Sequence, residues 1–77
     1  MYMTEISPYV KAGALIRAQR EAKQLTQLDV VRAMAALRVT TSEPALSRLE
    51  LGENKRAYTN AEFMDALARV LGMDVID

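Results

Sequence analysis

The chain of 77 residues contains no cysteine and no histidine. Without cysteine it forms no disulfide and has no thiolate nucleophile or ligand, and without histidine it lacks the commonest general base and the commonest metal ligand. The sequence also lacks a glycine-rich phosphate loop, and no carboxylates have the spacing of metal or catalytic sites. These absences argue against an enzyme and predict no metal, no cofactor and no small-molecule ligand.

Long apolar runs are also missing. No run approaches the length of a membrane span, and the N-terminus lacks the basic and apolar regions of a signal peptide. We therefore expect a soluble, cytoplasmic protein with no membrane partner.

Only two prolines and three glycines interrupt a sequence that is 51% hydrophobic and rich in alanine and leucine, which favours helices. A chain of this length makes one small domain, so we predict a single all-α domain over residues 1–77, with residues 1–7 as an N-terminal arm.

The ten basic and ten acidic side chains cancel, but they are unevenly distributed. Residues 11–56 carry nine basic and five acidic residues, a net charge of +4, whereas both ends of the chain are acidic. A basic segment favours a polyanionic partner such as nucleic acid. The net charge of zero favours a different class of function, a helical protein–protein interaction module that does not bind DNA.

Capping signals mark the first two predicted helices. Ser7 and Pro8 predict a helix from Pro8 to about Lys23. Thr26 and Asp29 have the spacing of a capping box and predict the start of a second helix. The pattern allows this helix to extend as far as Arg38, because the β-branched residues that follow it disfavour a helix. The expected apolar stripe of the first helix contains Ala12, Leu15 and Ile16, and that of the second contains Val30, Val31, Met34 and Leu37.

Residues 42–52 carry the start and stop signals of a third helix, which we predict over about 43–51. Ser42 is suited to cap it, and Pro44 lies in the first turn, where a missing N–H costs nothing. Leu46 and Leu49 share one face, which is expected to point at a core. Gly52 can take the left-handed conformation that ends a helix.

The C-terminal third predicts a polar loop followed by a further helix. The loop is expected over residues 53–58, and Thr59 or Asn60 is expected to cap the helix, with Glu62 available for a capping box with Thr59. Gly72 is expected to end this helix, and residues 73–77 leave room for the beginning of a fifth. The residues expected to face inward are Phe63, Leu67, Val70 and Leu71.

The sequence contains three motifs in this order: Leu25-Thr26-Gln27, Ser47-Arg48-Leu49-Glu50-Leu51-Gly52 and Ala68-Arg69-Val70-Leu71-Gly72. Together they resemble the phage repressor and Cro-type helix-turn-helix family, also called the XRE or lambda-repressor-like family. The resemblance implies a compact domain of four to five helices, in which the second and third form the helix-turn-helix. It also implies a sequence-specific transcriptional regulator, such as a phage-type repressor, a controller protein or an antitoxin, that is associated with the nucleoid when bound. The third helix would read a palindromic operator in the major groove of double-stranded DNA.

Candidate DNA-binding residues follow from this resemblance and from side-chain chemistry. Gln27 is expected to contact the DNA backbone, or else to be solvated. Arg48 is suited to guanine and Glu43 to cytosine, although Arg48 could form a surface ion pair and Glu43 could complement the helix dipole. The resemblance further implies a partly buried ion pair between Arg20 and Glu50. The remaining candidates for phosphate or base contacts are Thr41, Ser42, Ser47, Asn54, Lys55 and Arg56, for which ordinary capping or solvation is the alternative.

One spacing departs from the resemblance. The segment from Gln27 to Ser42 is about five residues longer than expected of the family, and the extra residues fall within 35–41. Either the second helix is longer or the turn is a loop.

Uncovered apolar residues lie near both ends of the chain. Because one recognition helix reads too few base pairs to select a genomic site, we expect a homodimer. The residues expected to close it are Val75 and Ile76, together with Tyr2, Met3 and Ile6, unless Val75 and Ile76 fold back onto the last helix.

Overall fold

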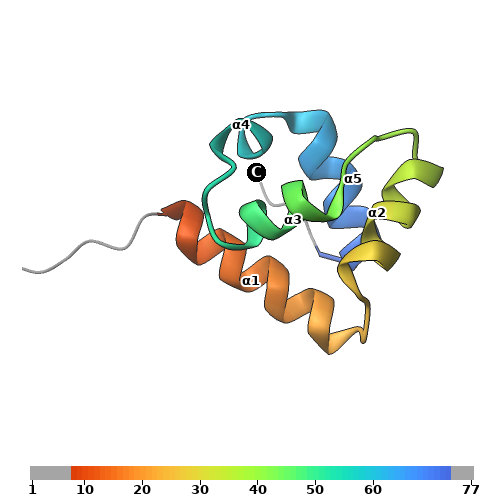
Figure 1. Cartoon of the computed structure of the whole chain (residues 1–77), viewed down its shortest axis with the longest axis horizontal. Coiled ribbons are helices and arrows are strands. Elements are labelled where there is room, and N and C mark those ends of the chain that lie inside the picture. Colours follow the sequence, from red (N-terminus) through yellow and green to blue (C-terminus); the bar gives the residue numbers. More distant parts are fainter. Residues whose placement is uncertain (1–7, 74–77) are drawn as a thin grey trace, which may run out of the picture.

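A computed structural model describes residues 8–73, and the described part contains five α-helices and no strand (Figure 1). This confirms the predicted all-α class. None of the described helices is both long and apolar enough to cross a membrane. The predicted arm over 1–7, the cap Ser7, and the apolar residues Val75 and Ile76 lie outside the described residues. The helices are α1 (Pro8–Ala22), α2 (Gln27–Ala36), α3 (Glu43–Glu50), α4 (Lys55–Tyr58) and α5 (Ala61–Leu71).

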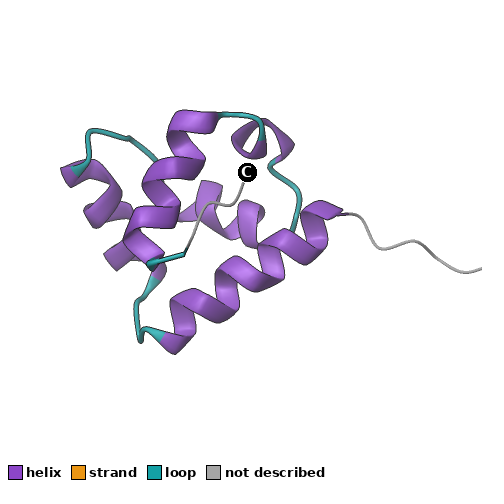
Figure 2. Cartoon of the chain, turned by 180° about the vertical axis from the view of Figure 1, so that it is seen from behind, coloured by secondary structure: helices purple, strands orange, loops and turns teal. Residues whose placement is uncertain are grey.

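The short helix α3 lies on one side of the molecule and α5 on the other. In Figure 1, α3 crosses in front of α5, and Figure 2 shows from behind that α5 is then nearer the viewer. Helix α3 packs against α1 and α2, whereas α5 packs against α2, α4 and α1. Helices α3 and α5 therefore lie on opposite sides of the packed helices.

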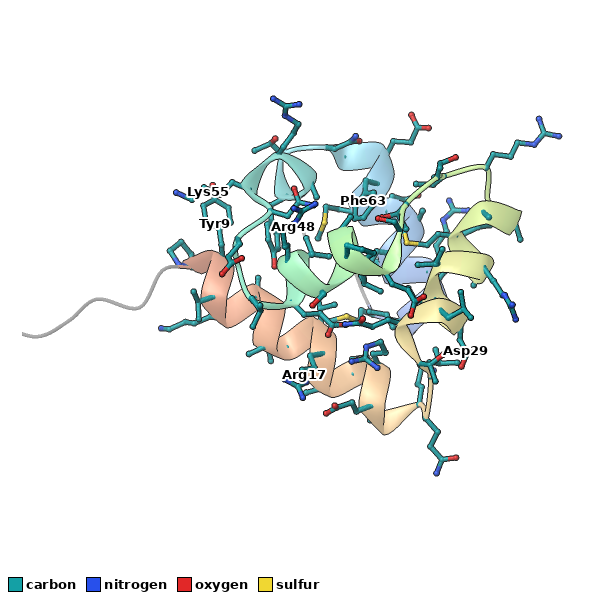
Figure 3. All side chains as sticks on the ribbon, viewed as in Figure 1. Tyr9, Arg17, Asp29, Arg48, Lys55 and Phe63 are labelled. Carbon is teal, nitrogen blue, oxygen red and sulfur yellow. The ribbon has the colours of Figure 1, made fainter. Side chains whose placement is uncertain are left out.

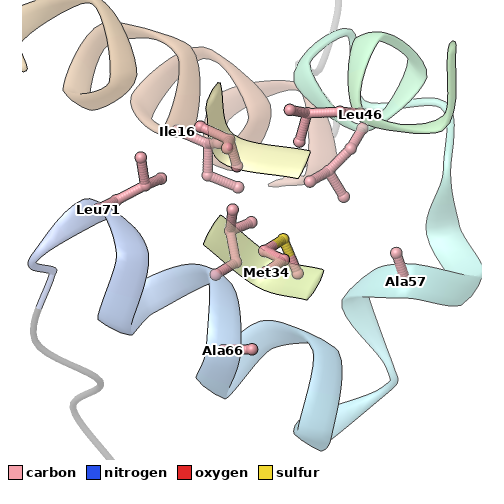
Figure 4. Close-up of a cluster of buried hydrophobic side chains, with 9 residues drawn as sticks. Ile16, Met34, Leu46, Ala57, Ala66 and Leu71 are labelled. Carbon is pink, nitrogen blue, oxygen red and sulfur yellow. The ribbon is translucent and has the colours of Figure 1, made fainter. Parts of the chain in front are cut away.

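The core forms where one apolar face from each helix meets the others (Figure 4). Full burial of a leucine or methionine side chain stabilises a fold by roughly 1.5–3 kcal/mol, so these residues hold the helices together. The predicted inward positions Leu46, Leu49, Leu67 and Leu71 are all buried. The complete set of buried hydrophobic residues is Ile16, Val30, Met34, Leu46, Leu49, Ala57, Ala66, Leu67 and Leu71.

Two predicted helix starts are confirmed in atomic detail. The Thr26 hydroxyl accepts a hydrogen bond from the Asp29 N–H at 3.0 Å, and the Asp29 carboxylate accepts one from the Thr26 N–H at 2.8 Å, which completes the capping box. These hydrogen bonds from Thr26, the backbone one first, lower the pKa of Asp29. At α3, the Ser42 hydroxyl accepts from the Ala45 N–H at 3.2 Å.

The four longer helices end in the same way, with one residue in the left-handed region. In each case the N–H that follows this residue bonds to a carbonyl five residues back, the Schellman arrangement. Gly52 and Gly72 end α3 and α5 as predicted, with φ of 80° and 66°. Gln24 and Arg38 take this conformation after α1 and α2, with φ of 59° and 66°, although neither is a glycine.

The extra residues between α2 and α3 form a loop and not a longer helix. Helix α2 stops at Ala36, because the left-handed Arg38 turns the chain and lets the Val39 N–H bond to the Met34 carbonyl at 2.9 Å. The expectation that Leu37 faces the core was therefore wrong: it follows the last helical residue and is 42% exposed. The segment between α2 and α3 is thus residues 37–42.

Two further expectations were also wrong. The predicted polar loop over 53–58 contains the helical turn α4, because the Asn54 side chain accepts from the Ala57 N–H at 3.4 Å and starts it. Of the two caps that were expected for this last helix, Asn60 is confirmed, while the Thr59 hydroxyl donates to the Arg56 carbonyl at 2.9 Å. On α1, Leu15 is 63% exposed, because it lies one helical step from the buried stripe.

Candidate nucleic-acid interface

Helix α3 has a fully buried side and an exposed side. Leu46 and Leu49 have no exposed surface and anchor it in the core. Glu43 and Arg48 are exposed, and Ser47 is half-buried beside them. These polar side chains therefore lie on a helix whose orientation is fixed by its apolar side.

The C-terminal end of α3 is joined to α1 by an ion pair. Arg20 donates to both oxygens of Glu50, from Nε to Oε2 at 2.6 Å and from Nη2 to Oε1 at 3.1 Å. Its Nη1 donates to the Leu25 carbonyl at 2.8 Å. The side chains of Arg20 and Glu50 are 12% and 3% exposed. The structure thus brings together the two residues predicted as an ion pair, and the hydrogen bonds to Glu50 raise the pKa of Arg20.

Gln27 joins the same group of side chains. Its amide nitrogen donates to Glu50 Oε1 at 3.2 Å, so the Glu50 carboxylate accepts three side-chain hydrogen bonds in all. A buried carboxylate requires such donors, since an unpaired one is costly. The residue predicted to meet the DNA backbone is therefore also a link between α2 and α3. The predicted burial of Glu50 was the available signal for this role, because a buried carboxylate needs more hydrogen-bond donors than one arginine supplies.

Two glycines let α1 approach the end of α3 closely. A Cβ added at Gly13 would lie 2.5 Å from the Glu50 carbonyl oxygen, and one added at Gly52 would lie 2.6 Å from the Val10 Cα. Gly13 is not among the residues that the sequence predicted to matter. Its signal is a glycine in the interior of a helix, which disfavours the helix and so needs a packing reason.

Tyr58 on α4 closes the same end of α3. Its hydroxyl donates to the Leu49 carbonyl at 2.6 Å and lies 3.3 Å from the Tyr9 carbonyl oxygen. The Tyr9 and Tyr58 rings pack with centroids 5.1 Å apart. Burial, followed by the charge of Glu50, raises the pKa of Tyr58. Three elements, α1, α2 and α4, thus hold one end of α3.

The three candidates at the start of α4 differ in their surroundings. The Asn54 side chain is occupied as the cap of α4. Lys55 and Arg56 are exposed, and the Lys55 Nζ lies 5.9 Å from the centre of the Tyr9 ring (Figure 3). Lys55 and Arg56 are therefore available for an anionic partner, whereas Asn54 shapes the backbone that presents them.

At the start of α3, the remaining candidates follow one another along the chain. Thr41 is half-buried, Ser42 is the cap, and Glu43 is exposed in the first turn. The Ser42 hydroxyl is engaged with the Ala45 N–H. Glu43 is therefore exposed beside a serine whose hydroxyl serves as the helix cap.

A polar hollow of about 220 Å³ opens beside α3. Its walls come from α1, α2 and α3 and the residue after α3, and they contain the Arg20–Glu50 ion pair. The residues that line it are Arg17, Arg20, Gln27, Ser47, Glu50 and Leu51. Over residues 8–73, the structure contains no group of three or more acidic side chains suited to a metal ion.

Comparison of the chain with protein-family models, with curated proteins and with solved structures gives no match. The likeness to the helix-turn-helix family therefore rests on the sequence motifs.

Proposed function

We propose that this protein is a sequence-specific DNA-binding transcriptional regulator that inserts α3 into the major groove. The observation that supports this most is the asymmetry of α3. One side and the C-terminal end are held by α1, α2 and α4, while Glu43, Ser47 and Arg48 lie on the other side. A reading helix needs such rigid support, because base contacts depend on precise geometry.

The side chains divide into base-reading and backbone-binding groups. Arg48 is suited to the O6 and N7 acceptors of guanine, and Glu43 to the N4 donor of cytosine. Lys55 and Arg56, exposed at the start of α4, are suited to phosphates. Thr41, Ser42 and Ser47 add hydroxyls near the start and middle of α3.

The test begins with selection of binding sites from a pool of random duplexes, followed by affinity measurements at several salt concentrations. Arg48→Ala is expected to cost about 1–3 kcal/mol on the selected site and to relax one base position. Lys55→Ala and Arg56→Ala are each expected to weaken binding to all sequences and to reduce the slope of log affinity against log salt by about one.

The controls separate local contacts from net charge. Arg69→Ala removes an exposed arginine from α5, on the other side of the molecule, and is expected to change neither slope nor specificity. Equal losses on selected and random duplexes for Arg48→Ala would remove Arg48 from base reading. Failure to enrich any site would contradict the proposed function.

A homodimer on a palindromic site is part of this proposal. Two-fold dimers of helix-turn-helix proteins bind half-sites about 34–36 Å apart. The apolar residues expected to close the dimer lie in 1–7 and 74–77, outside the described residues. Light scattering with and without a palindromic duplex is expected to give two chains per duplex, and one chain per duplex at saturation would contradict the dimer.

A second candidate function is favoured by an apolar groove of about 250 Å³ between α1 and α5. Leu15 on its rim is 63% exposed, as expected of a surface that binds a protein. If the chain is a protein-interaction module, Leu15→Gln should abolish its partner binding and Arg48→Ala should not. The residues that line the groove are Ala12, Leu15, Ile16, Met64, Leu67, Ala68 and Met73.

A further inference from the structure

The polar hollow beside α3 contains an arginine that belongs to none of the sequence motifs. Arg17 comes from α1 and lines the hollow together with Gln27 from α2 and Ser47 from α3. Ser47 lies one helical turn after Glu43, so the hollow continues the exposed stripe of α3. Figure 3 shows Arg17 on the stretch of α1 that runs below α3.

The side chains that line the hollow carry two positive charges and one negative charge. The Glu50 carboxylate in its wall is compensated by Arg20, which donates to both of its oxygens. Arg17 therefore adds a positive charge that Glu50 does not offset. Its partner is Glu21, with 3.2 Å between Arg17 Nε and Glu21 Oε2.

Arg17 can exchange Glu21 for another anionic partner at little cost in free energy. The two side chains are 59% and 55% exposed. Exposed pairs of this kind contribute little, because water and salt screen them. A phosphate, with its full charge and several acceptor oxygens, is a stronger partner for a guanidinium.

We propose that this hollow binds one backbone phosphate of DNA, with Arg17 as the residue that holds it. Ser47 and Gln27 offer further donors from a hydroxyl and an amide. The inference rests on the proposed function and adds a contact outside the helix-turn-helix. Glu21 competes with the phosphate for Arg17, so Arg17 and Glu21 should affect affinity in opposite directions.

The chain offers a matched control on the other side of the molecule. Asp65 and Arg69 on α5 form an ion pair of the same spacing, with 3.1 Å between Arg69 Nε and Asp65 Oδ2 and exposures of 70% for Arg69 and 56% for Asp65. Removing a charge from this pair changes the net charge by the same amount as removing one from Arg17–Glu21. Any effect of net charge alone should therefore appear in both pairs.

The experiment measures DNA affinity of four alanine variants, at Arg17, Glu21, Asp65 and Arg69, on the selected site and on an unrelated duplex. Arg17→Ala is expected to weaken binding to both duplexes about tenfold near 0.1 M salt and to lower the salt slope by about one. Glu21→Ala is expected to strengthen binding by about two- to fivefold, because it frees Arg17. The α5 variants should stay within about twofold of the wild type.

The outcomes separate this inference from the proposed function. If Arg17→Ala matches Arg69→Ala while Arg48→Ala still weakens binding, the hollow is not a phosphate site and the proposed function stands. If the wild type binds no duplex, the proposed function fails and this inference fails with it. Equal thermal unfolding curves for all four variants are expected and exclude misfolding as a cause.

A free phosphate ion has the same chemistry as a backbone phosphate. Titration with inorganic phosphate, followed by NMR shifts of the Ser47 and Gln27 backbone amides, distinguishes the two. If the hollow binds a backbone phosphate of DNA, inorganic phosphate in the low millimolar range should not saturate the shifts of these two amides. The duplex, by contrast, should shift both clearly. Saturation by inorganic phosphate alone would overturn the assignment to DNA.

Discussion

The two ends of α3 are held in different ways. The C-terminal end is in contact with α1, α2 and α4 through the Arg20–Glu50 pair, Gln27 and Tyr58. The N-terminal end begins at the Ser42 cap and follows the loop over residues 37–42. Most of the contacts that fix α3 therefore lie far from the exposed Glu43.

The side chains that hold α3 in place are thus concentrated at its C-terminal end. A contact at the C-terminal end fixes the direction of the whole helix, because α3 is only eight residues long. Substitutions of the side chains that hold the C-terminal end, such as Arg20 and Glu50, should thus lower stability, and substitution of the exposed Glu43 should affect stability much less.

The largest effect is expected for Arg20→Ala, which leaves the Glu50 carboxylate buried without its main donor. Loss of about 3–5 kcal/mol is expected from such a stranded charge. The Arg20→Ala, Glu50→Ala double variant should lose much less than the sum of the single losses. Urea unfolding of the four proteins in this cycle measures the coupling.

Arg20→Lys keeps the charge but not the two-point contact, and it serves as a milder variant if Arg20→Ala does not fold. The stability of Arg20→Lys is expected to lie between that of the wild type and that of Arg20→Ala. Additive losses for Arg20 and Glu50 would show that the two side chains do not interact in solution.

Gly13→Ala is expected to cost about 2 kcal/mol, because the added methyl carbon would lie 2.5 Å from the Glu50 carbonyl oxygen. Ala14→Gly, on the exposed side of the same helix, should cost only about 1 kcal/mol through helix propensity. Thermal unfolding measures the loss of stability in each of the two variants. If Gly13→Ala raised the stability, as it would in an uncrowded helix, α1 and α3 would not be in close contact.

Gly52→Ala and Gly72→Ala compare a crowded helix end with an open one. Both residues are left-handed, so each substitution is expected to cost about 1 kcal/mol of backbone strain. At Gly52 the new Cβ also meets the Val10 backbone at 2.6 Å, whereas at Gly72 the nearest atoms among the described residues belong to the flexible Lys23 side chain, at 3.1 Å. Urea unfolding should therefore show a loss about 1 kcal/mol larger at Gly52, and equal losses would contradict the crowding.

The sequence predicted the parts of the fold that depend on neighbours along the chain. The Thr26–Asp29 capping box, the Ser42 cap and the Gly52 stop each act over a few residues, and the structure has all three. The buried leucines of α3 followed from helical periodicity.

Features that depend on tertiary packing were predicted less well. Leu15 and Ile16 are neighbours on α1, and the packing of α1 against the other helices decides that Ile16 and not Leu15 is buried. The bond from Gln27 to Glu50 spans 23 residues of sequence and needs the packed structure. The end of α2 was missed because Arg38 takes a left-handed conformation that is typical of glycine.

The smallest effect is expected at Arg38, in the loop that precedes α3. Its φ of 66° is costly for a residue with a Cβ, and glycine adopts it without strain. Arg38→Gly is therefore expected to stabilise the fold by about 1 kcal/mol, partly offset by the greater entropy of glycine in the unfolded chain. Arg38→Ala removes the same charge but keeps the strain, so its thermal unfolding should stay close to that of the wild type.

Because this loop precedes α3 and the ion pair lies at the other end of the helix, Arg38→Gly should raise the stability without changing the coupling between Arg20 and Glu50. A loss of stability with Arg38→Gly would mean that the arginine side chain holds the loop, and that the N-terminal end of α3 is fixed more firmly than its few contacts indicate.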